Sequence, residues 1–527
     1  MAHRSDSMPS WWNPSVEDTL MWPSLRPYNL SQVPLISLLD VPFEAEASAL
    51  HDNHACSSLH LSPHVREAYM ASSQGGLDDP TEMKQLVDWF MKSIHTKQPV
   101  IDPDVLYKQI AVVQENGLSW DGPTCLLLIA CALGAICTPY SHSTLEDYSS
   151  PSIDSHRYLR SREYFDAGRR RLGLTMEHAS ITGVQCFFFA AGYYITTFNP
   201  FAAWRTMNAA SVMCKNVMMI SHEDSGGGSE FESSDSNEAR DNSRRKLFWS
   251  CLKTEREMAT ELGFDIANLH LIEYKTPTTM LHDPNLQVPH INVDMPSPQP
   301  FTPNPTALGR LRIEEQEQSW FYYLTDISLR KLEIQIDSFF RSKQQQPSPM
   351  SEAYEVFYRD ILVTLADSDQ QIVDHFKRLP APISVETDDS GHSPDDLREY
   401  LRLRMIRIRH DLSRPALYLI LHGVFDDISA HMRAQAVQIA NRALAIDEYL
   451  VTHGLTTHRH PGTWLGVRYC TRAALELFAA AKAGSPDIIL PRNWRAGMER
   501  FKVALRYWSA ESRDALLYLG WIERLES

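Results

Sequence analysis

The residues best suited to metal chemistry lie near the start of the chain. Residues 51–64 contain four histidines and one cysteine, namely His51, His54, Cys56, His60 and His64. Zinc sites are built from closely spaced pairs of cysteines, or of cysteines and histidines, and a single cysteine cannot supply such pairs. We therefore interpret the cluster as part of a solvated, histidine-bearing segment, with a zinc site as the less favoured alternative.

The other cysteines are scattered through apolar stretches. Cys125, Cys131 and Cys137 are spaced six residues apart, so on a helix each points about 120° away from the one before, and they cannot share a metal. We predict that they are small core residues. Eight cysteines in 527 residues are too few for a disulfide-stapled secreted domain, which favours a reducing compartment.

Acidic and histidine groups offer two further candidates. The segment 395–399 reads DDLRE, the spacing with which helical prenyl-transfer enzymes hold magnesium diphosphate. It follows Ser393-Pro394, where the free amides of a helix start favour acids, and Asp426-Asp427 lacks the residues of a second such motif. We therefore interpret these acids as a helix cap. The histidines at 453, 458 and 460 are expected to be exposed in a loop between helices.

Arginines form rows on two predicted helices. One row holds Arg157, Arg160, Arg162 and Arg169–Arg171, and the other holds Arg402, Arg404, Arg407, Arg409 and Arg414. A DNA-facing role would need interleaved aromatic residues or a groove-reading motif, and neither accompanies these rows. The chain has a net charge of −16, so we expect the rows to pair with acidic helices.

The elements that carry these residues are predicted to be helices throughout. Apolar residues recur at spacings of three and four from Met83 onward, and no segment of consequence alternates as a strand does. The longest apolar runs, 124–136 and 184–195, fall short of the ~20 residues that a bilayer requires, so we expect no membrane span. The predicted helices cover about 122–138, 155–172, 177–197, 200–220, 242–263, 310–343, 351–379, 394–422, 428–453, 462–484 and 491–524. The predicted fold class is all-α.

Composition divides the chain into four parts. We expect a mostly loose N-terminal arm at 1–80 with room for one short helix, a helical domain at 81–275, a proline-rich linker at 276–309, and a C-terminal helical region at 310–527 that packs on the preceding domain. The linker is placed by eight prolines between residues 276 and 305, which no helix would tolerate. Within the helical domain, residues 221–243 are predicted to be an acidic Ser/Gly loop.

Several segments of the helical domain follow a recognisable order. Residues 86–102, 125–137, 158–171 and 182–194 are followed by the segment 244–251, RRKLFWSC, and then by ERE at 255–257. This order resembles the fungal-specific transcription factor domain, the middle homology region of zinc-cluster transcription factors. We expect its signature residues to be structural and assign them no catalytic role: Arg244, Arg245, Phe248, Trp249, Cys251, Glu255, Arg256 and Glu257.

The resemblance implies a nuclear regulator of transcription rather than an enzyme. Its expected partners are proteins of the transcription machinery, a zinc-cluster factor or a small-molecule inducer, with DNA contacted only indirectly or through an N-terminal module. Family members usually bind zinc through six cysteines in that module. Residues 1–80 hold one cysteine, so we expect no cofactor in this chain. Either the zinc cluster has been lost from this sequence, or the regulator has no DNA contact of its own.

Two alternatives stay open at this point. One is a helical ligand-binding protein or an accessory enzyme of a metabolic pathway, with prenyl transfer as the least favoured form. The other is a dimerisation partner that joins zinc-cluster factors without binding DNA.

Overall fold

A computed structural model describes residues 14–30, 76–137, 155–224, 234–264, 307–343, 352–385, 395–423, 429–455 and 458–527, together with residues 267, 269 and 272. These residues form helices and short helical turns and include no strand, which confirms the all-α prediction. Among them, no helix combines the length and apolar character that crossing a bilayer would need. The α-helices are α1 (Val16–Leu20), α4 (Pro80–Phe90), α5 (Pro103–Asn116), α6 (Gly122–Ile136), α7 (His156–Arg169), α8 (Ile181–Thr196), α9 (Pro200–Asp224), α10 (Ser234–Leu262), α11 (Ala307–Ser342), α12 (Glu352–Lys377), α13 (Asp396–Leu421), α14 (Ala430–His453), α15 (Thr463–Ala483), α16 (Trp494–Ser509) and α17 (Arg513–Glu526).

Aspartates mark the starts of several helices. Asp79, Asp102 and Asp121 accept hydrogen bonds from first-turn amides of α4, α5 and α6, and each of these helices has proline at its first or second position. Asp395 accepts from the amide of Leu397 at 2.9 Å and caps α13 in the same way. The interpretation of the acids at 395–399 as a helix cap is therefore confirmed for Asp395.

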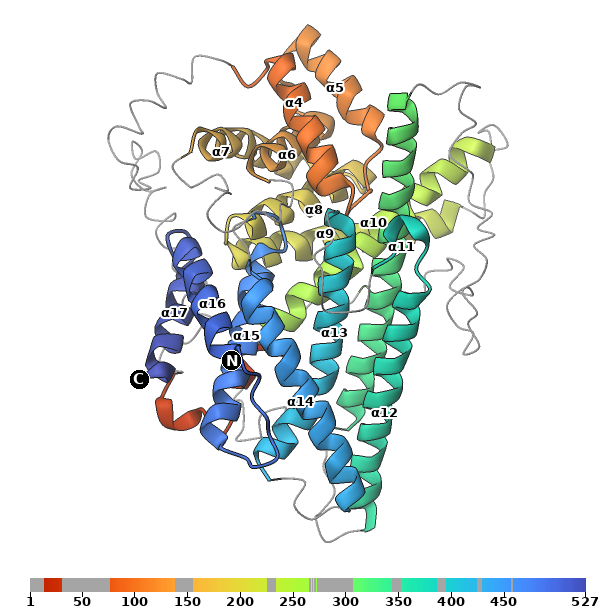
Figure 1. Cartoon of the computed structure of the whole chain (residues 1–527). Helices are drawn as coiled ribbons and strands as arrows, with labels where there is room; N and C mark the ends of the chain where they lie inside the picture. Colours follow the sequence, from red (N-terminus) through yellow and green to blue (C-terminus); the bar gives the residue numbers. More distant parts are fainter. Residues whose placement is uncertain are drawn as a thin grey trace.

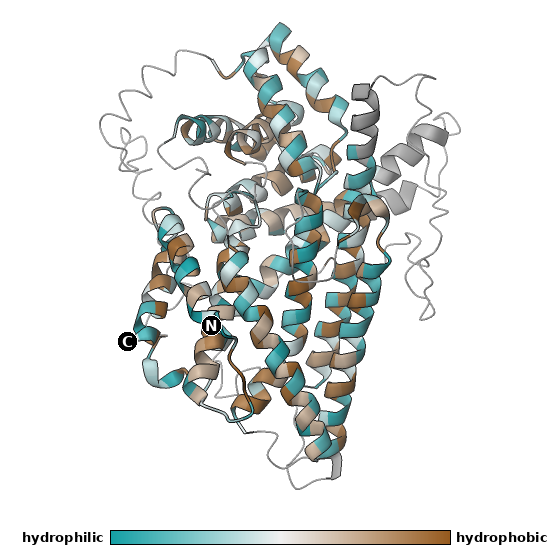
Figure 2. Cartoon of the chain, viewed as in Figure 1, coloured by the Kyte–Doolittle hydropathy of each residue, from teal (hydrophilic) through white to brown (hydrophobic). Residues whose placement is uncertain are grey.

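The apolar side chains form two cores. One is formed by α4 through α10 with Trp464 and Leu465 at the start of α15, and the other joins residues 16–30 to α11 through α17. Figure 1 shows α4 to α7 at one end of the molecule, with the long helices α12, α13 and α14 side by side toward the other end. Most helices carry apolar residues on one side and polar residues on the other (Figure 2). In contrast, α6 is buried along its whole length from Thr124 to Ile136, because α4, α7 and α8 surround it.

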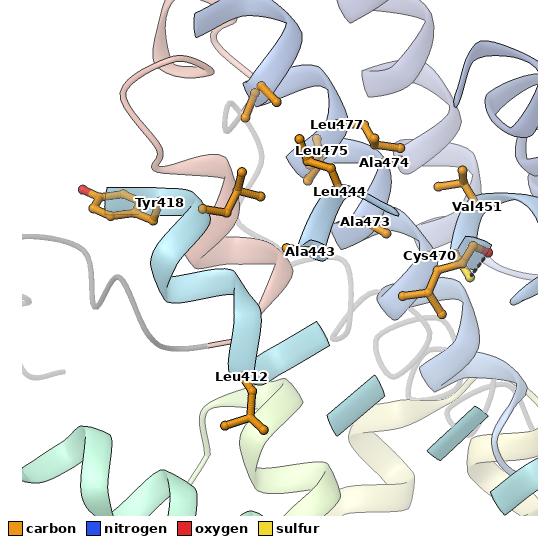
Figure 3. Close-up of a cluster of buried hydrophobic side chains, with 14 of the residues drawn as sticks. Leu412, Tyr418, Ala443, Leu444, Val451, Cys470, Ala473, Ala474, Leu475 and Leu477 are labelled. Atoms are coloured by element: carbon orange, nitrogen blue, oxygen red, sulfur yellow. Dashed lines mark hydrogen bonds between the residues drawn. The ribbon is translucent and has the colours of Figure 1, made fainter. Parts of the chain in front are cut away.

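The centre of the second core lies where α13, α14 and α15 meet (Figure 3). Leu412, Leu444 and Leu477 are almost completely buried there. Alanines such as Ala443 and Ala473 lie between them and let the helix backbones approach. Cys470 lies 3.3 Å from the carbonyl oxygen of Leu450. It is one of seven cysteines among the described residues, and all seven are free and buried, as predicted for core positions.

Two predicted segment boundaries need correction. The loop expected at 221–243 is too long, because α9 extends to Asp224 and α10 already begins at Ser234. Once a buried helical turn exists, each added residue contributes one more hydrogen bond, so a helix extends readily through polar sequence. The expected helix 491–524 is in fact two helices, and Ser512 caps the second by accepting from the amide of Ala515 at 3.2 Å.

The proline-rich linker is mostly outside the described residues. Its predicted end at 309 is wrong, because α11 begins at Ala307.

Residues 14–30 contain a short helix, which the sequence allowed in the arm at 1–80, but they are packed on the second core rather than loose. They form α1 and a further helical turn, and Trp22 is completely buried in the second core. Ser15 caps α1, while Glu17 pairs with Arg468 of α15 at 2.7 Å. The helical run is only five residues long, too short for its periodicity to be seen in the sequence. The histidine cluster at 51–64 lies outside the described residues.

Candidate functional site

The signature segment 244–257 lies along α10. Phe248 and Cys251 are buried in the first core, while Trp249 is half-buried, with the ammonium of Lys331 4.6 Å from the centre of its ring. Arg244 and Arg245 are half-buried. They lie inside the helix rather than at its start, where the sequence had placed them, because α10 begins ten residues earlier.

The acidic and basic residues at 255–257 connect α10 to its surroundings. Glu255 accepts from the amide of Leu269 at 3.2 Å, and Arg256 pairs with Asp337 of α11 at 3.0 Å. Glu257 lies between three guanidinium groups, those of Arg330 at 2.7 Å, Arg407 at 2.9 Å and Arg404 at 3.3 Å. Through these contacts α10 is tied to both α11 and α13.

A second carboxylate extends this network. Asp326 of α11 contacts Lys253 at 2.8 Å and Arg404 at 3.3 Å. Burial favours the neutral form of Glu257 and Asp326, but the adjacent cations outweigh it and hold the pKa of both carboxyls well below the usual range. Both are therefore ionised at neutral pH.

The pairing of arginines with acids, expected for both rows, holds for most of the second row and for part of the first. In addition to Arg404 and Arg407, Arg409 contacts Asp369 at 2.7 Å and Arg414 contacts Glu476 at 2.7 Å. In the first row, Arg160 contacts Glu82 at 2.6 Å.

The charge network forms one wall of a cavity of about 270 Å³. Side chains from α8, α10, α11, α13 and α15 line this central cavity, together with the loop that follows α14. The lining also includes apolar side chains, those of Leu133, Phe188, Phe189, Ile195 and Leu465. The cavity thus lies between the helices that carry the signature segment and the C-terminal helices.

One end of the central cavity holds a basic and aromatic group, made of Lys97, Tyr400, His458 and His460. The Lys97 ammonium lies 4.3 Å from the centre of the Tyr400 ring, and the Tyr400 hydroxyl lies 2.9 Å from Nε2 of His458. The rings of His458 and His460 are stacked with centres 4.8 Å apart. We call these four residues the basic end of the cavity. Lys97 reaches it because α4 finishes in a π-helical turn, Met91–His95, that directs the following residues inward.

The prediction that His453, His458 and His460 are exposed is wrong. His458 is 3% exposed, and His453 and His460 are half-buried. Arg459 between them is completely buried, where it donates to Glu511 at 2.6 Å and to the carbonyl of Thr196 at 3.2 Å. These bonds draw the loop inward, and no local sequence pattern signals a contact over such separations.

Both histidines at the basic end are neutral at physiological pH. Burial lowers the pKa of His458 well below its usual range, and the neighbouring His460 and Lys97 lower it further. Burial and the charge of Lys97 lower the pKa of His460 to about 3. Burial also lowers the pKa of Lys97, an effect that Asp396, at 3.9 Å, opposes.

A separate polar group lies in the second core, between α13, α14 and α15. His410 Nε2 is 2.6 Å from Asp447 and 3.1 Å from Glu476, so these residues have the types and proximity of metal ligands. However, 2.6 Å is a hydrogen-bond distance that leaves no room for an ion between the two atoms. Arg414 and Arg472 also contact the group and would repel a cation. The arrangement is therefore that of a buried ion-pair network joining three helices.

Sequence reasoning identified only part of the site. It predicted acidic partners for the arginine rows and a structural role for residues 255–257, but it missed the basic end, whose residues are distant in sequence. The available signal was the 97–102 segment, KQPVID, which falls within residues 86–102 of the resemblance. The acids of the DDLRE segment do not face a second acidic motif among the described residues, and Asp426-Asp427 lies outside them.

Comparison with known proteins gives one match. Residues 87–329 match the model of the fungal specific transcription factor domain, whereas no curated protein matches the chain. The matched region runs from α4 to α11 and includes the signature segment and one side of the central cavity, while α13 to α15 on the other side lie beyond it. Residues 87–329 are therefore similar to the fungal-specific transcription factor domain.

Proposed function

We propose that this chain regulates transcription in the nucleus as a helical regulatory body, and that its output depends on how the matched domain and the C-terminal helices are held together. The observation that carries the proposal is the position of the signature acid Glu257. It bridges α10 of the matched domain to α13 of the C-terminal region, beside the central cavity.

A small-molecule inducer in the central cavity would contact both parts of the chain at once. A ligand that binds only the assembled arrangement stabilises it by RT ln(1 + L/Kd), where L is the free ligand concentration, and so shifts the population toward it. The assembled surface would then engage proteins of the transcription machinery or a zinc-cluster factor. DNA would be contacted indirectly or through an N-terminal module.

The cavity also favours the wider class of helical ligand-binding proteins. Catalysis by prenyl transfer is a poorer fit, because Asp395 is used as a helix cap and the polar wall of the cavity carries more cations than carboxylates. We therefore assign the cavity a binding role and no chemical step.

A reporter assay tests the proposal. The whole chain is joined to a heterologous DNA-binding module, and expression from the matching reporter is measured. Gly192 lines the cavity with open space around the position of a Cβ, so Gly192→Leu places a side chain in it. We expect this variant to change reporter output several-fold. Gly520→Leu is the matched control, because Gly520 also has open space but lies on the exposed face of α17.

Unchanged output on deletion of the chain, in the reporter and across the transcripts of the native host, would contradict the proposal. Equal output from the two glycine variants would show that the cavity has no part in regulation.

A further inference from the structure

The basic end of the central cavity contains hydrogen-bond donors that the protein itself does not use. An ammonium group has three N–H donors. Lys97 donates to the carbonyl of Ser93 at 2.8 Å, and its nearest carboxylate, Asp396, is 3.9 Å away, beyond hydrogen-bond range. Among the described residues no other acceptor contacts this ammonium. It therefore has donors available on the cavity side.

His460 supplies a second available donor, and its hydrogen-bond partner fixes where its proton lies. Nδ1 accepts from the amide of Gly462 at 3.0 Å, so Nδ1 carries no hydrogen. A neutral imidazole then has its hydrogen on Nε2. No described group accepts from this Nε2–H. Lys97 and His460 both contact the Tyr400 ring, at 4.3 Å and 5.0 Å from its centre, so the two donors flank one aromatic side chain.

The positive charge of Lys97 at the basic end favours a ligand with a negatively charged group. The lining of the cavity contains five cations and two carboxylates. Glu257 and Asp326 are the two carboxylates, and both are engaged with arginines or Lys253. Of the five cations, Lys97 has the weakest pairing in the described structure, a single carboxylate at 3.9 Å. An anionic group placed beside Lys97 gains a partner, whereas a cation would be repelled.

The apolar side chains of the cavity favour a ligand whose remaining part is a hydrocarbon. Phe188, Phe189, Ile195 and Leu465 line the cavity and supply apolar surface in addition to the polar groups. The volume of about 270 Å³ lies just below the ~300 Å³ at which pockets for drug-sized ligands begin, which suits a ligand of about ten to fifteen heavy atoms.

From these features we propose that the central cavity binds an organic monocarboxylate with an apolar body, its carboxylate held by Lys97 Nζ and His460 Nε2 and its hydrocarbon part against Phe188 and Leu465. This rests on the proposed function in one respect, because it names the class of molecule that would serve as the inducer. One carboxylate accepts several hydrogen bonds and so satisfies both donors at once.

Calorimetric titration of the full chain tests the proposal. The probes are decanoate and 2-naphthoate, with decan-1-ol and 2-naphthol as uncharged counterparts of the same shape. Charge-assisted hydrogen bonds are stronger than neutral ones, so we expect each acid to bind about 10- to 100-fold more tightly than its alcohol.

Two lysine variants locate the effect. Lys97→Met should weaken the binding of the acids at least tenfold and leave the binding of the alcohols unchanged, so that the preference for the acid disappears. Lys482→Met is the matched control, because Lys482 also lies over an aromatic ring, that of Tyr28 at 4.8 Å, but outside the cavity lining. It should bind all probes as the unaltered chain does. Equal binding of acid and alcohol, or a preference that survives in Lys97→Met, would overturn the proposal.

The two proposals can fail separately. If the acids do not bind but Gly192→Leu still changes reporter output, the ligand class is wrong and the regulatory role stands. If the acids bind as expected but reporter output never responds to the cavity, the binding site stands and the regulatory role is wrong.

Discussion

At the level of single residues, Glu257 concentrates several ionic contacts between helices. Its carboxylate contacts Arg330, Arg404 and Arg407, which belong to α11 and α13. Removing one partner from a buried ion pair lowers the free energy of unfolding by far more than the intact pair contributes to it. The reason is that the remaining charges stay buried without a counter-ion. Glu257 is therefore a sensitive point of the structure, although its chemistry there is only electrostatic.

Replacing Glu257 by glutamine should lower the free energy of unfolding at pH 7 by about 3–5 kcal/mol. The folded-state pKa of this carboxyl is depressed, so its stabilising contribution is fully present above the ordinary pKa of 4.5 and is lost as the pH falls through the folded value. We therefore expect a constant difference between the variant and the unaltered chain from pH 7 to 5, which narrows below about pH 4.5. Urea denaturation monitored by circular dichroism at each pH measures this difference in the free energy of unfolding.

The control for this variant is Glu355→Gln, since Glu355 is half-exposed and its contact with Arg359 is long, at 3.8 Å. It should change stability by less than about 0.5 kcal/mol at any pH. A Glu257→Gln difference that persists unchanged at pH 3 would show that the contribution is steric rather than electrostatic.

At the scale of helices, the first core depends on a close crossing of α4 and α6. A Cβ at Gly134 would overlap the carbonyl oxygen of Leu86 and lie 3.1 Å from the amide nitrogen of Phe90. Backbone atoms cannot move aside as a flexible side chain can, so glycine is required there by the approach of the two helices.

Gly134→Ala should therefore destabilise the protein by about 1–3 kcal/mol, because α4 has to shift away from α6. The same substitution at Gly520, in a helix with open space around it, should have the opposite sign and stabilise by about 0.5–1 kcal/mol. Thermal unfolding of both variants shows whether their stability changes have opposite signs. If Gly134→Ala were as stable as the unaltered chain, α4 and α6 would not cross as closely as described.

At the scale of the whole molecule, segments far apart in sequence are joined at α15. Arg468 contacts Glu17 near the start of the chain at 2.7 Å, Glu261 at the end of α10 at 2.8 Å, and Tyr518 of α17 at 3.0 Å. Trp22 adds a contact with α13, because its ring packs against that of Tyr418 with ring centres 5.4 Å apart. In Figure 1 the described N-terminal residues 14–30, drawn in red, lie among these C-terminal helices.

We expect Trp22→Ala to cost about 3–5 kcal/mol, since it removes a completely buried aromatic side chain and leaves a cavity beside α13. Met21→Ala is the control from the adjacent position, because Met21 is 43% exposed and should lose less than about 0.5 kcal/mol. Urea midpoints of the two variants give the comparison. Similar midpoints for both would mean that residues 14–30 are not held on the C-terminal helices in solution.

The sequence by itself determined the helical class and most helix positions. Helical periodicity and capping aspartates are local signals, because the residues that produce them lie within a few positions of one another. The burial of Leu247, Phe248 and Cys251 on one face of α10 follows from such spacing. The pairing of arginine rows with acids followed from net charge alone, although the particular partners did not.

Only the tertiary structure decided what lies at the centre of the molecule. Lys97, Tyr400 and His460 meet across more than three hundred residues, and the burial of His458 depends on bonds that its neighbour Arg459 makes to α8 and to Glu511. Docking of residues 14–30 likewise needs a surface that α13 and α15 create together. Such contacts depend on how whole helices pack, which periodicity along one segment does not specify, so a binding cavity walled by distant segments is invisible until the chain is folded.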